Sequence, residues 1–199
     1  MAYADFSLEK IEKEFGIENQ IEEIFSEILP IEPSDYLKKT IEAAKKLPMR
    51  SEKARSEGIV FPVLLEMRER NNEFFTIYSG ENLNVEPEKG LNGECDFIIA
   101  KDTKRYDVSF PILQIVEAKK NDLDGAVPQC AAQMVGAKIF NQKKGYNLPF
   151  VYGCVTTGEE WLFMKLAEKI FIDNRKYFLN ELTLILGVLQ EIINQFKRL

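Results

Sequence analysis

An acidic residue and a lysine close an apolar segment in the middle of the chain. Residues 111–120 are Pro-Ile-Leu-Gln-Ile-Val-Glu-Ala-Lys-Lys. Because side chains alternate along a strand, Glu117 and Lys119 point to the same face. Both faces of the segment are largely apolar, which is typical of a central strand covered on both sides. A carboxylate and an ammonium group there are costly unless they are paired, and a metal ion and a phosphate would pair them.

Other polar residues fall in the order that one site at this strand end requires. Asp96 begins a predicted strand at residues 95–100, just before the strand that ends in Glu117. Asp96 and Glu117 offer hard oxygen ligands for Mg²⁺ or Mn²⁺, and the carbonyl of Ala118 can add a third. Such a metal polarises a phosphoryl oxygen and activates water. Lys119 would orient or help to deprotonate that water and stabilise the charge on the phosphate.

Two helices supply further candidates. Glu52, near the start of a predicted helix, would bind a second metal ion or hold Lys119, and Glu57 is its rival on the same helix. Gln129 would orient the water or the phosphate, and Gln133 lies one turn further along. Each residue also has an ordinary structural interpretation, as a turn cap, a strand-end ion pair or a half-exposed helix position. Singly these interpretations are favoured, whereas jointly the order of the residues favours a site.

The composition excludes several other classes of chemistry. The chain has 199 residues and no histidine, so Ser-His-Asp triads, Cys-His nucleophiles and histidine-bound zinc are excluded. Its three cysteines are far apart, and their spacing indicates neither a disulfide framework nor a zinc site. The net charge of −6 argues against strong non-specific binding to nucleic acid. No secretory signal or membrane-spanning segment is evident, so we expect a cytoplasmic protein.

The hydrophobic pattern predicts a mixed α/β fold: a central mixed β-sheet flanked by helices, with an N-terminal helical extension. Residues 1–49 are predicted to be helical and to pack on a core domain at 50–199. Within them, an apolar stripe at residues 17–28 has helical spacing, and Ser34 is a fair N-cap for a further helix. A helix at 51–70 should be kinked at Pro62, with Gly58 easing the clash of the proline ring. A turn is expected at Ser79-Gly80. The remaining predicted elements are strands at 74–78, 83–85, 95–100, 111–119, 150–156, 161–164 and 169–172, and helices from about 127 and at 178–196.

These residues, taken together, resemble the PD-(D/E)xK restriction-endonuclease-like superfamily. The likeness rests on Asp96, the Glu117-Ala118-Lys119 segment after an apolar strand, and the helix that carries Gln129. The chain is most similar to small uncharacterised cyanobacterial members. The segment around Glu52 also resembles the opening helix of the nuclease domain of type I restriction subunits. One departure is Cys95, which stands where the family pattern has a proline.

The resemblance implies metal-dependent hydrolysis of phosphodiester bonds, with DNA as the expected partner and Mg²⁺ or Mn²⁺ as the cofactor. It carries over Asp96, Glu117 and Lys119 as catalytic, together with Glu52 and Gln129. A homodimer is expected, and a protein partner could bind through the N-terminal helices. The alternative is a catalytically silent interaction or regulatory subunit with the same fold. Candidate phosphate contacts on polar loops and helix ends are Lys101, Lys104, Arg105, Lys120, Lys143 and Lys144.

Overall fold

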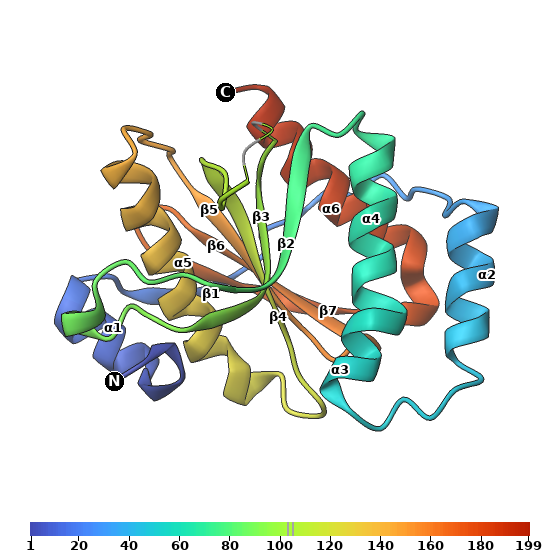
Figure 1. The fold of residues 1–199 in the computed structure, drawn as a ribbon, viewed down its shortest axis with the longest axis horizontal. Helices are drawn as coiled ribbons and strands as arrows, with labels where there is room; N and C mark the ends of the chain where they lie inside the picture. Colours follow the sequence, from blue (N-terminus) through green and yellow to red (C-terminus); the bar gives the residue numbers. More distant parts are fainter. Residues whose placement is uncertain (103, 105) are drawn as a thin grey trace.

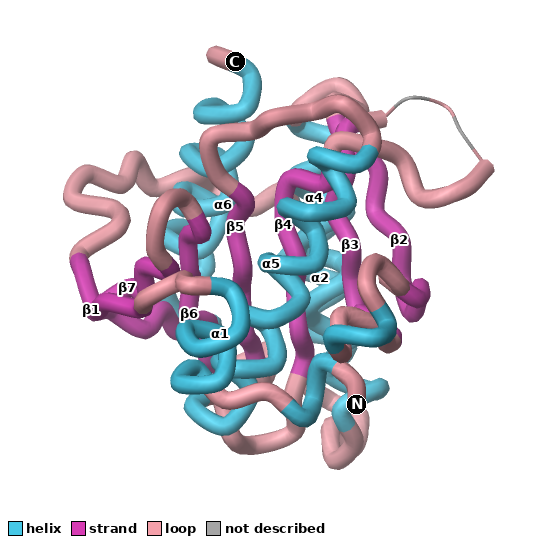
Figure 2. The backbone as a smooth tube through the Cα atoms, turned by 90° about the vertical axis from the view of Figure 1, so that its left-hand side faces the viewer, coloured by secondary structure: helices cyan, strands magenta, loops and turns pink. Residues whose placement is uncertain are grey.

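A mixed β-sheet forms the centre of the molecule. The computed structural model describes residues 1–102, 104 and 106–199, and in this part of the chain the sheet has seven strands in the order β1-β7-β6-β5-β4-β3-β2. Figure 2 shows the strands side by side in this order. Their bounds are β1 Asn19–Glu22, β2 Phe75–Asn82, β3 Glu94–Lys101, β4 Ile112–Ala118, β5 Val151–Thr156, β6 Glu160–Leu166 and β7 Ile170–Phe178.

The pairing directions explain the connections between the strands. Strands β2, β3 and β4 form an antiparallel meander, and β5, β6 and β7 form a second one. The two meanders meet at β4 and β5, which are parallel. Parallel neighbours need a long crossover connection, and α5 (Val127–Lys143) provides it. The mixed α/β sheet predicted from the sequence is therefore confirmed.

Helices cover both faces of the sheet (Figure 1). On one face lie α1 (Leu8–Phe15) and α5, and on the other lie α2 (Asp35–Ala44), α4 (Phe61–Arg70) and α6 (Leu182–Lys197). Each face has its own apolar core. Small residues let α5 approach the sheet closely, because its buried turns contain Ala131 and Ala132, and a Cβ on Gly153 of β5 would collide with Met134.

The helical segment before β2 is continuous but irregular. It consists of α3 (Glu52–Arg55), a π-helical turn at Ser56–Val60 and then α4. Pro62 lies in the first turn of α4, and its ring nitrogen has no hydrogen to donate. The π-helical turn immediately precedes it, with the amide of Phe61 donating to the carbonyl of Ser56. The irregularity expected around Pro62 and Gly58 thus takes the form of a π-helical turn.

The prediction for the N-terminal region is right for two helices and wrong for the apolar stripe between them. Ser34 caps α2, with its hydroxyl oxygen accepting from the amide of Leu37 at 3.1 Å. Residues 17–28, however, form no helix. They contain β1, which pairs in parallel with β7 at the edge of the sheet. Pairing with a strand far away in the sequence overrides the local helical spacing, as tertiary context often does.

Three smaller predictions need correction. Ser79 and Gly80 make no chain-reversing turn, since β2 runs through them to Asn82. Residues 83–85 lie outside the strands, although the amide of Leu83 still donates to the carbonyl of Gly93. Strand β7 reaches Phe178, so the last helix begins only at Leu182. Within the described residues, no helix has the length and apolarity needed to cross a membrane.

Candidate functional site

Glu117 is the centre of the candidate site. It lies on β4 near the end of the strand, and only 2% of its surface is exposed. Its Oε1 atom accepts hydrogen bonds from Lys119 Nζ at 2.6 Å and from Gln129 Nε2 at 2.5 Å. Its Oε2 atom accepts from Gln133 Nε2 at 2.9 Å. The structure therefore brings together four of the predicted residues and gives both rival glutamines a contact with the same carboxylate.

The fold explains this convergence. Glu117 points to the face of the sheet that α5 covers, and Gln129 and Gln133 lie one turn apart near the start of that helix. The amide of Gln133 is fully buried and turns its donor end to Glu117, while its Oε1 atom has no hydrogen-bond partner among the described residues. A buried acceptor without a partner is costly. Gln133 thus leaves its own oxygen unpaired, within the part of the chain that the structure describes, in order to donate to Glu117. Together with Lys119 and Gln129, it provides hydrogen-bond donors that suit an ionised Glu117.

Asp96 meets the same strand end from β3. Its Oδ2 atom accepts a hydrogen bond from the amide of Ala118 at 2.7 Å. The pairing of β2 with β3 passes from Ser79–Phe97 to Glu81–Cys95 without a shift in register, so Gly80 lies opposite Asp96. In an extended strand, the N–H and C=O groups of one residue point the same way. The carbonyl of Ala118 is therefore directed to the side on which Asp96 lies.

The two carboxylates lack enough positive charge around them. Burial and the neighbouring charge of Glu117 raise the pKa of Asp96 to about 7. Burial also raises the pKa of Glu117, although Lys119 and the glutamine amide oppose this effect. Burial lowers the pKa of Lys119, but the charge and hydrogen bond of Glu117, together with the charges of Glu52 and Asp96, outweigh this effect and raise the pKa above its usual value. One ammonium group serves the buried Glu117 and the partly buried Asp96, and a further cation would relieve the repulsion between the two acids.

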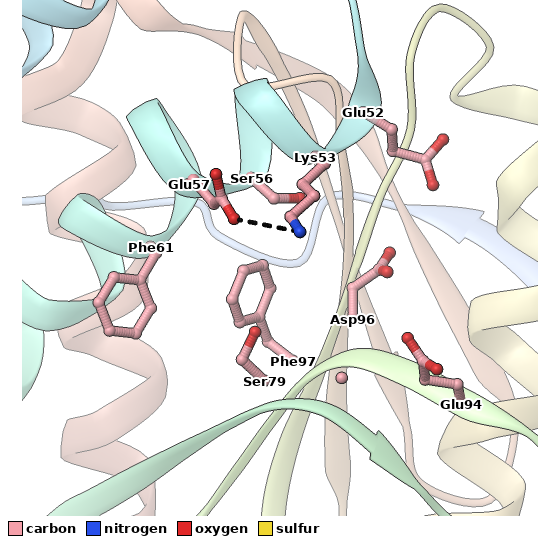
Figure 3. Close-up of a pocket in the computed structure, with 10 residues that line it drawn as sticks. Glu52, Lys53, Ser56, Glu57, Phe61, Ser79, Glu94, Asp96 and Phe97 are labelled. Carbon is pink, nitrogen blue, oxygen red and sulfur yellow. Dashed lines mark ion pairs between the residues drawn. The ribbon is translucent and has the colours of Figure 1, made fainter.

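Glu52 contacts Lys119 of the site, whereas Glu57 pairs with a different lysine, Lys53. Glu52 Oε1 lies 4.0 Å from Lys119 Nζ. Glu57, one turn further along, instead lies 3.9 Å from Lys53 on its own helical segment. Figure 3 shows Glu52 on the same side of the pocket as Asp96, and Glu57 on the opposite side beside Lys53. Of the two acidic residues proposed from the sequence, Glu52 is the one that contacts Lys119.

A pocket of about 660 Å³ opens beside Asp96. It lies between the helical segment 52–61 and strands β2 and β3 (Figure 3). One end is acidic and the other is aromatic. Its lining side chains include Glu52, Lys53, Ser56, Glu57, Phe61, Ser79, Glu94, Asp96 and Phe97. Sequence reasoning missed Phe61, because a phenylalanine at the start of an apolar helix resembles an ordinary core residue.

Most of the lysines proposed as phosphate contacts lie at the other end of the sheet. Lys101 ends β3, roughly 17 Å along the strand from Asp96. Lys143 and Lys144 lie at the end of α5, roughly 20 Å from Gln129. Lys104 pairs with Asp102, and Arg105 lies outside the described residues. Lys120 follows Lys119 directly and is exposed, so it alone of the described candidates adjoins the site.

The oxygen donors of Asp96, Glu117 and Ala118 fit a magnesium ion completed by water and phosphate better than a metal ion held entirely by protein side chains. Within residues 1–102, 104 and 106–199, no three His, Cys, Asp or Glu side chains lie together so as to hold a metal ion. Asp96 and Glu117 with the Ala118 carbonyl offer two carboxylates and one main-chain oxygen. Mg²⁺ is commonly held by one or two carboxylates, with water and substrate phosphate completing its shell. These are the residues that could hold Mg²⁺ or Mn²⁺.

Comparisons of the chain with protein-family models, with curated proteins and with solved structures found no match in any of the three.

Proposed function

We propose that this protein is a Mg²⁺-dependent nuclease that hydrolyses phosphodiester bonds of DNA. The observation that carries the proposal is the convergence of Asp96, Glu117 and Lys119 at the ends of two neighbouring strands, where one ammonium group lies by a buried and a partly buried carboxylate. The resemblance of these residues to the PD-(D/E)xK superfamily supports the same activity. The proposal includes a cytoplasmic location and a homodimer.

Each side chain has a defined role in the proposed reaction. Asp96 and Glu117, with the Ala118 carbonyl, would bind the metal ion, which supplies Lewis-acid activation of the phosphate and of water. Lys119 donates a hydrogen bond at this edge, and there it would orient the attacking water and stabilise the negative charge that develops on the phosphate. Gln129 and Gln133 hold the Glu117 carboxylate in one orientation.

Glu52 and burial shape the same centre. Glu52 lies 4.0 Å from Lys119 and would hold the ammonium group over the reacting phosphate. Because Glu117 is almost fully buried, its charge acts in a medium of low polarity, where electrostatic interactions are stronger than in water. Lys119 stays protonated in this environment, as the rise of its pKa requires. Its chemical role is therefore that of a hydrogen-bond donor and a fixed positive charge.

The test combines metal binding with cleavage of DNA. Calorimetric titration of the wild type with Mn²⁺ should show binding that Glu117→Ala abolishes. Cleavage of single- and double-stranded DNA should fall by about 100-fold or more in Glu117→Ala and in Lys119→Ala. The matched control is Glu88→Gln, a change at an exposed acidic residue, which should keep full activity. Absence of Mn²⁺ binding, or cleavage that survives both alanine substitutions, would refute the proposal.

A second candidate function is a catalytically silent interaction or regulatory subunit. The observation that favours it is the ring of carboxylates around the site, in which Glu52 and Glu94 join Asp96 at the pocket. Such a ring repels nucleic-acid phosphates unless metal ions neutralise it. The two functions differ in one result. A nuclease gains DNA binding when Mn²⁺ is added, whereas a silent subunit binds neither, and it associates with a protein partner through α1 or α2.

A further inference from the structure

A partly exposed aromatic ring lines the pocket that opens beside Asp96. Phe61, the first residue of α4, is 37% exposed and lines the pocket. Its ring stacks on that of Phe97, with centroids 6.3 Å apart and planes inclined by 24°. Phe97 is buried and directly follows Asp96 in β3. The strand that presents Asp96 therefore also presents a buried ring that packs beside Phe61 (Figure 3).

The rest of the pocket is suited to hydrogen-bond donors and not to phosphate. Glu52, Glu57 and Glu94 line it, and Lys53 is the cation among its lining residues. Lys53 lies 3.9 Å from Glu57, so carboxylates outnumber this one ammonium group in the pocket. A phosphate group would be repelled here. Nucleobases, in contrast, combine a flat face with amino groups, and carboxylates accept hydrogen bonds from such amino groups.

The backbone around the pocket is also unusual. The π-helical turn Ser56–Val60 forms one wall, and π-helical turns occur often at functional sites. It carries Ser56 and Glu57 to the pocket, directly before Phe61. A volume of about 660 Å³ is within the range of pockets that bind small organic groups, and it exceeds what a hydrated metal ion would need.

We infer that this pocket binds an unpaired nucleobase next to the scissile phosphate, so that the substrate is single-stranded or locally unpaired DNA. The inference rests on the proposed nuclease function and deepens it. The base stacks on Phe61, and its amino group donates to the glutamates that line the pocket, Glu52, Glu57 and Glu94 (the acidic wall). The phosphate of the same nucleotide lies outside the pocket near Lys119. In a paired duplex both faces of a base are covered by its neighbours, so only an unpaired base can lie on Phe61.

The experiment measures binding of fluorescently labelled DNA to the full-length protein by anisotropy, with Ca²⁺ in place of Mg²⁺. The wild type should bind a short oligodeoxycytidine more tightly than oligodeoxythymidine, because thymine lacks an amino group, and more tightly than a duplex of the same length. Phe61→Leu should weaken binding of the single strand about tenfold, since base–aromatic stacking is lost. Phe61→Tyr keeps a ring and should retain the affinity. Tyr36→Leu, which removes an exposed aromatic from α2, should bind as the wild type does.

Two outcomes overturn the inference: equal single-strand binding by the wild type and Phe61→Leu, or binding of the duplex or oligodeoxythymidine at least as tight as that of oligodeoxycytidine. A parallel cleavage assay with Mg²⁺ separates this inference from the proposed function. Cleavage without an effect of Phe61→Leu on binding removes the base pocket and leaves the nuclease. Binding that depends on Phe61, without any cleavage, supports the base pocket and removes the nuclease.

Discussion

Neutralising Asp96 should make the protein more stable in the absence of metal. The substitution is Asp96→Asn, which keeps the shape of the side chain and an oxygen that can accept from the amide of Ala118. It removes a partly buried negative charge next to Glu117. Functional sites commonly contain such unfavourable charges, which are retained for activity at a cost in stability.

The magnitude follows from the pKa of Asp96. Burial and the charge of Glu117 raise this pKa from 3.8 to about 7. At 1.36 kcal/mol per pH unit, the ionised form of Asp96 lowers the free energy of unfolding by at most about 4 kcal/mol. Because relaxation and water reduce such penalties, we expect Asp96→Asn to gain about 1–2 kcal/mol at pH 8.

The gain should depend on pH in one direction. A carboxyl group with a raised folded-state pKa binds its proton more tightly in the folded protein than in the unfolded chain. Its cost is therefore absent below about pH 4, grows as the pH rises towards 7, and is constant above that value. The stability difference between Asp96→Asn and the wild type should follow this curve.

Urea denaturation followed by circular dichroism, at pH 4.5 and pH 8 in EDTA, measures the difference. The control is Asp107→Asn, at an exposed position, which should change stability by less than about 0.5 kcal/mol at either pH. Adding Mg²⁺ should stabilise the wild type and not Asp96→Asn, because only the wild type keeps both proposed ligands. The reasoning is refuted if Asp96→Asn is less stable than the wild type in EDTA at pH 8.

Three further predictions concern the packing around the sheet. Ser34→Ala should lower the free energy of unfolding by about 1–2 kcal/mol in urea denaturation, because Ser34 caps α2 and donates to Glu66 Oε2 at 2.6 Å. Burial raises the pKa of Glu66, but hydrogen bonds from Ser34 and Arg70 lower it overall. The stabilisation that the ionised Glu66 contributes is therefore present above about pH 4.3 and is lost as the pH falls through its folded-state pKa. Glu66→Gln should flatten that part of the stability–pH curve measured by urea denaturation. Gly136→Ala should cost about 1–3 kcal/mol, seen as a lower Tm, because the added methyl group would collide with the hydroxyl of Tyr3; an unchanged Tm would contradict this packing.

The two strands that carry Asp96 and Glu117 could be predicted from local sequence. The apolar segment that ends in Glu117 and Lys119 has a strand pattern that survives in the structure, and the neighbouring strand brings Asp96 to it as expected. The choice between Gln129 and Gln133 could not be made, because both lie on one helical face and both contact Glu117. Spacing alone does not distinguish one turn from the next.

Other features depended on contacts between distant segments. Residues 17–28 have helical spacing, yet β1 forms there because β7 offers an edge to pair with. Gly80 suggested a turn, but its positive φ of 68° is accommodated within β2, opposite Asp96. Phe61 is informative only once Phe97 and the acidic wall lie around it. In each case the decisive partner is remote in sequence.

The parallel pairing of β1 with β7 has a consequence for the order of folding. During synthesis, Asn19–Glu22 leaves the ribosome about 150 residues before its partner Ile170–Asp173. Closing so long a loop is entropically costly and comes after local contacts have formed. The β2–β3–β4 meander, which carries Asp96 and Glu117, can assemble from neighbouring segments well before then. The part of the sheet that holds the proposed metal ligands is thus expected to form early in the nascent chain, and the edge at β1 to be completed last.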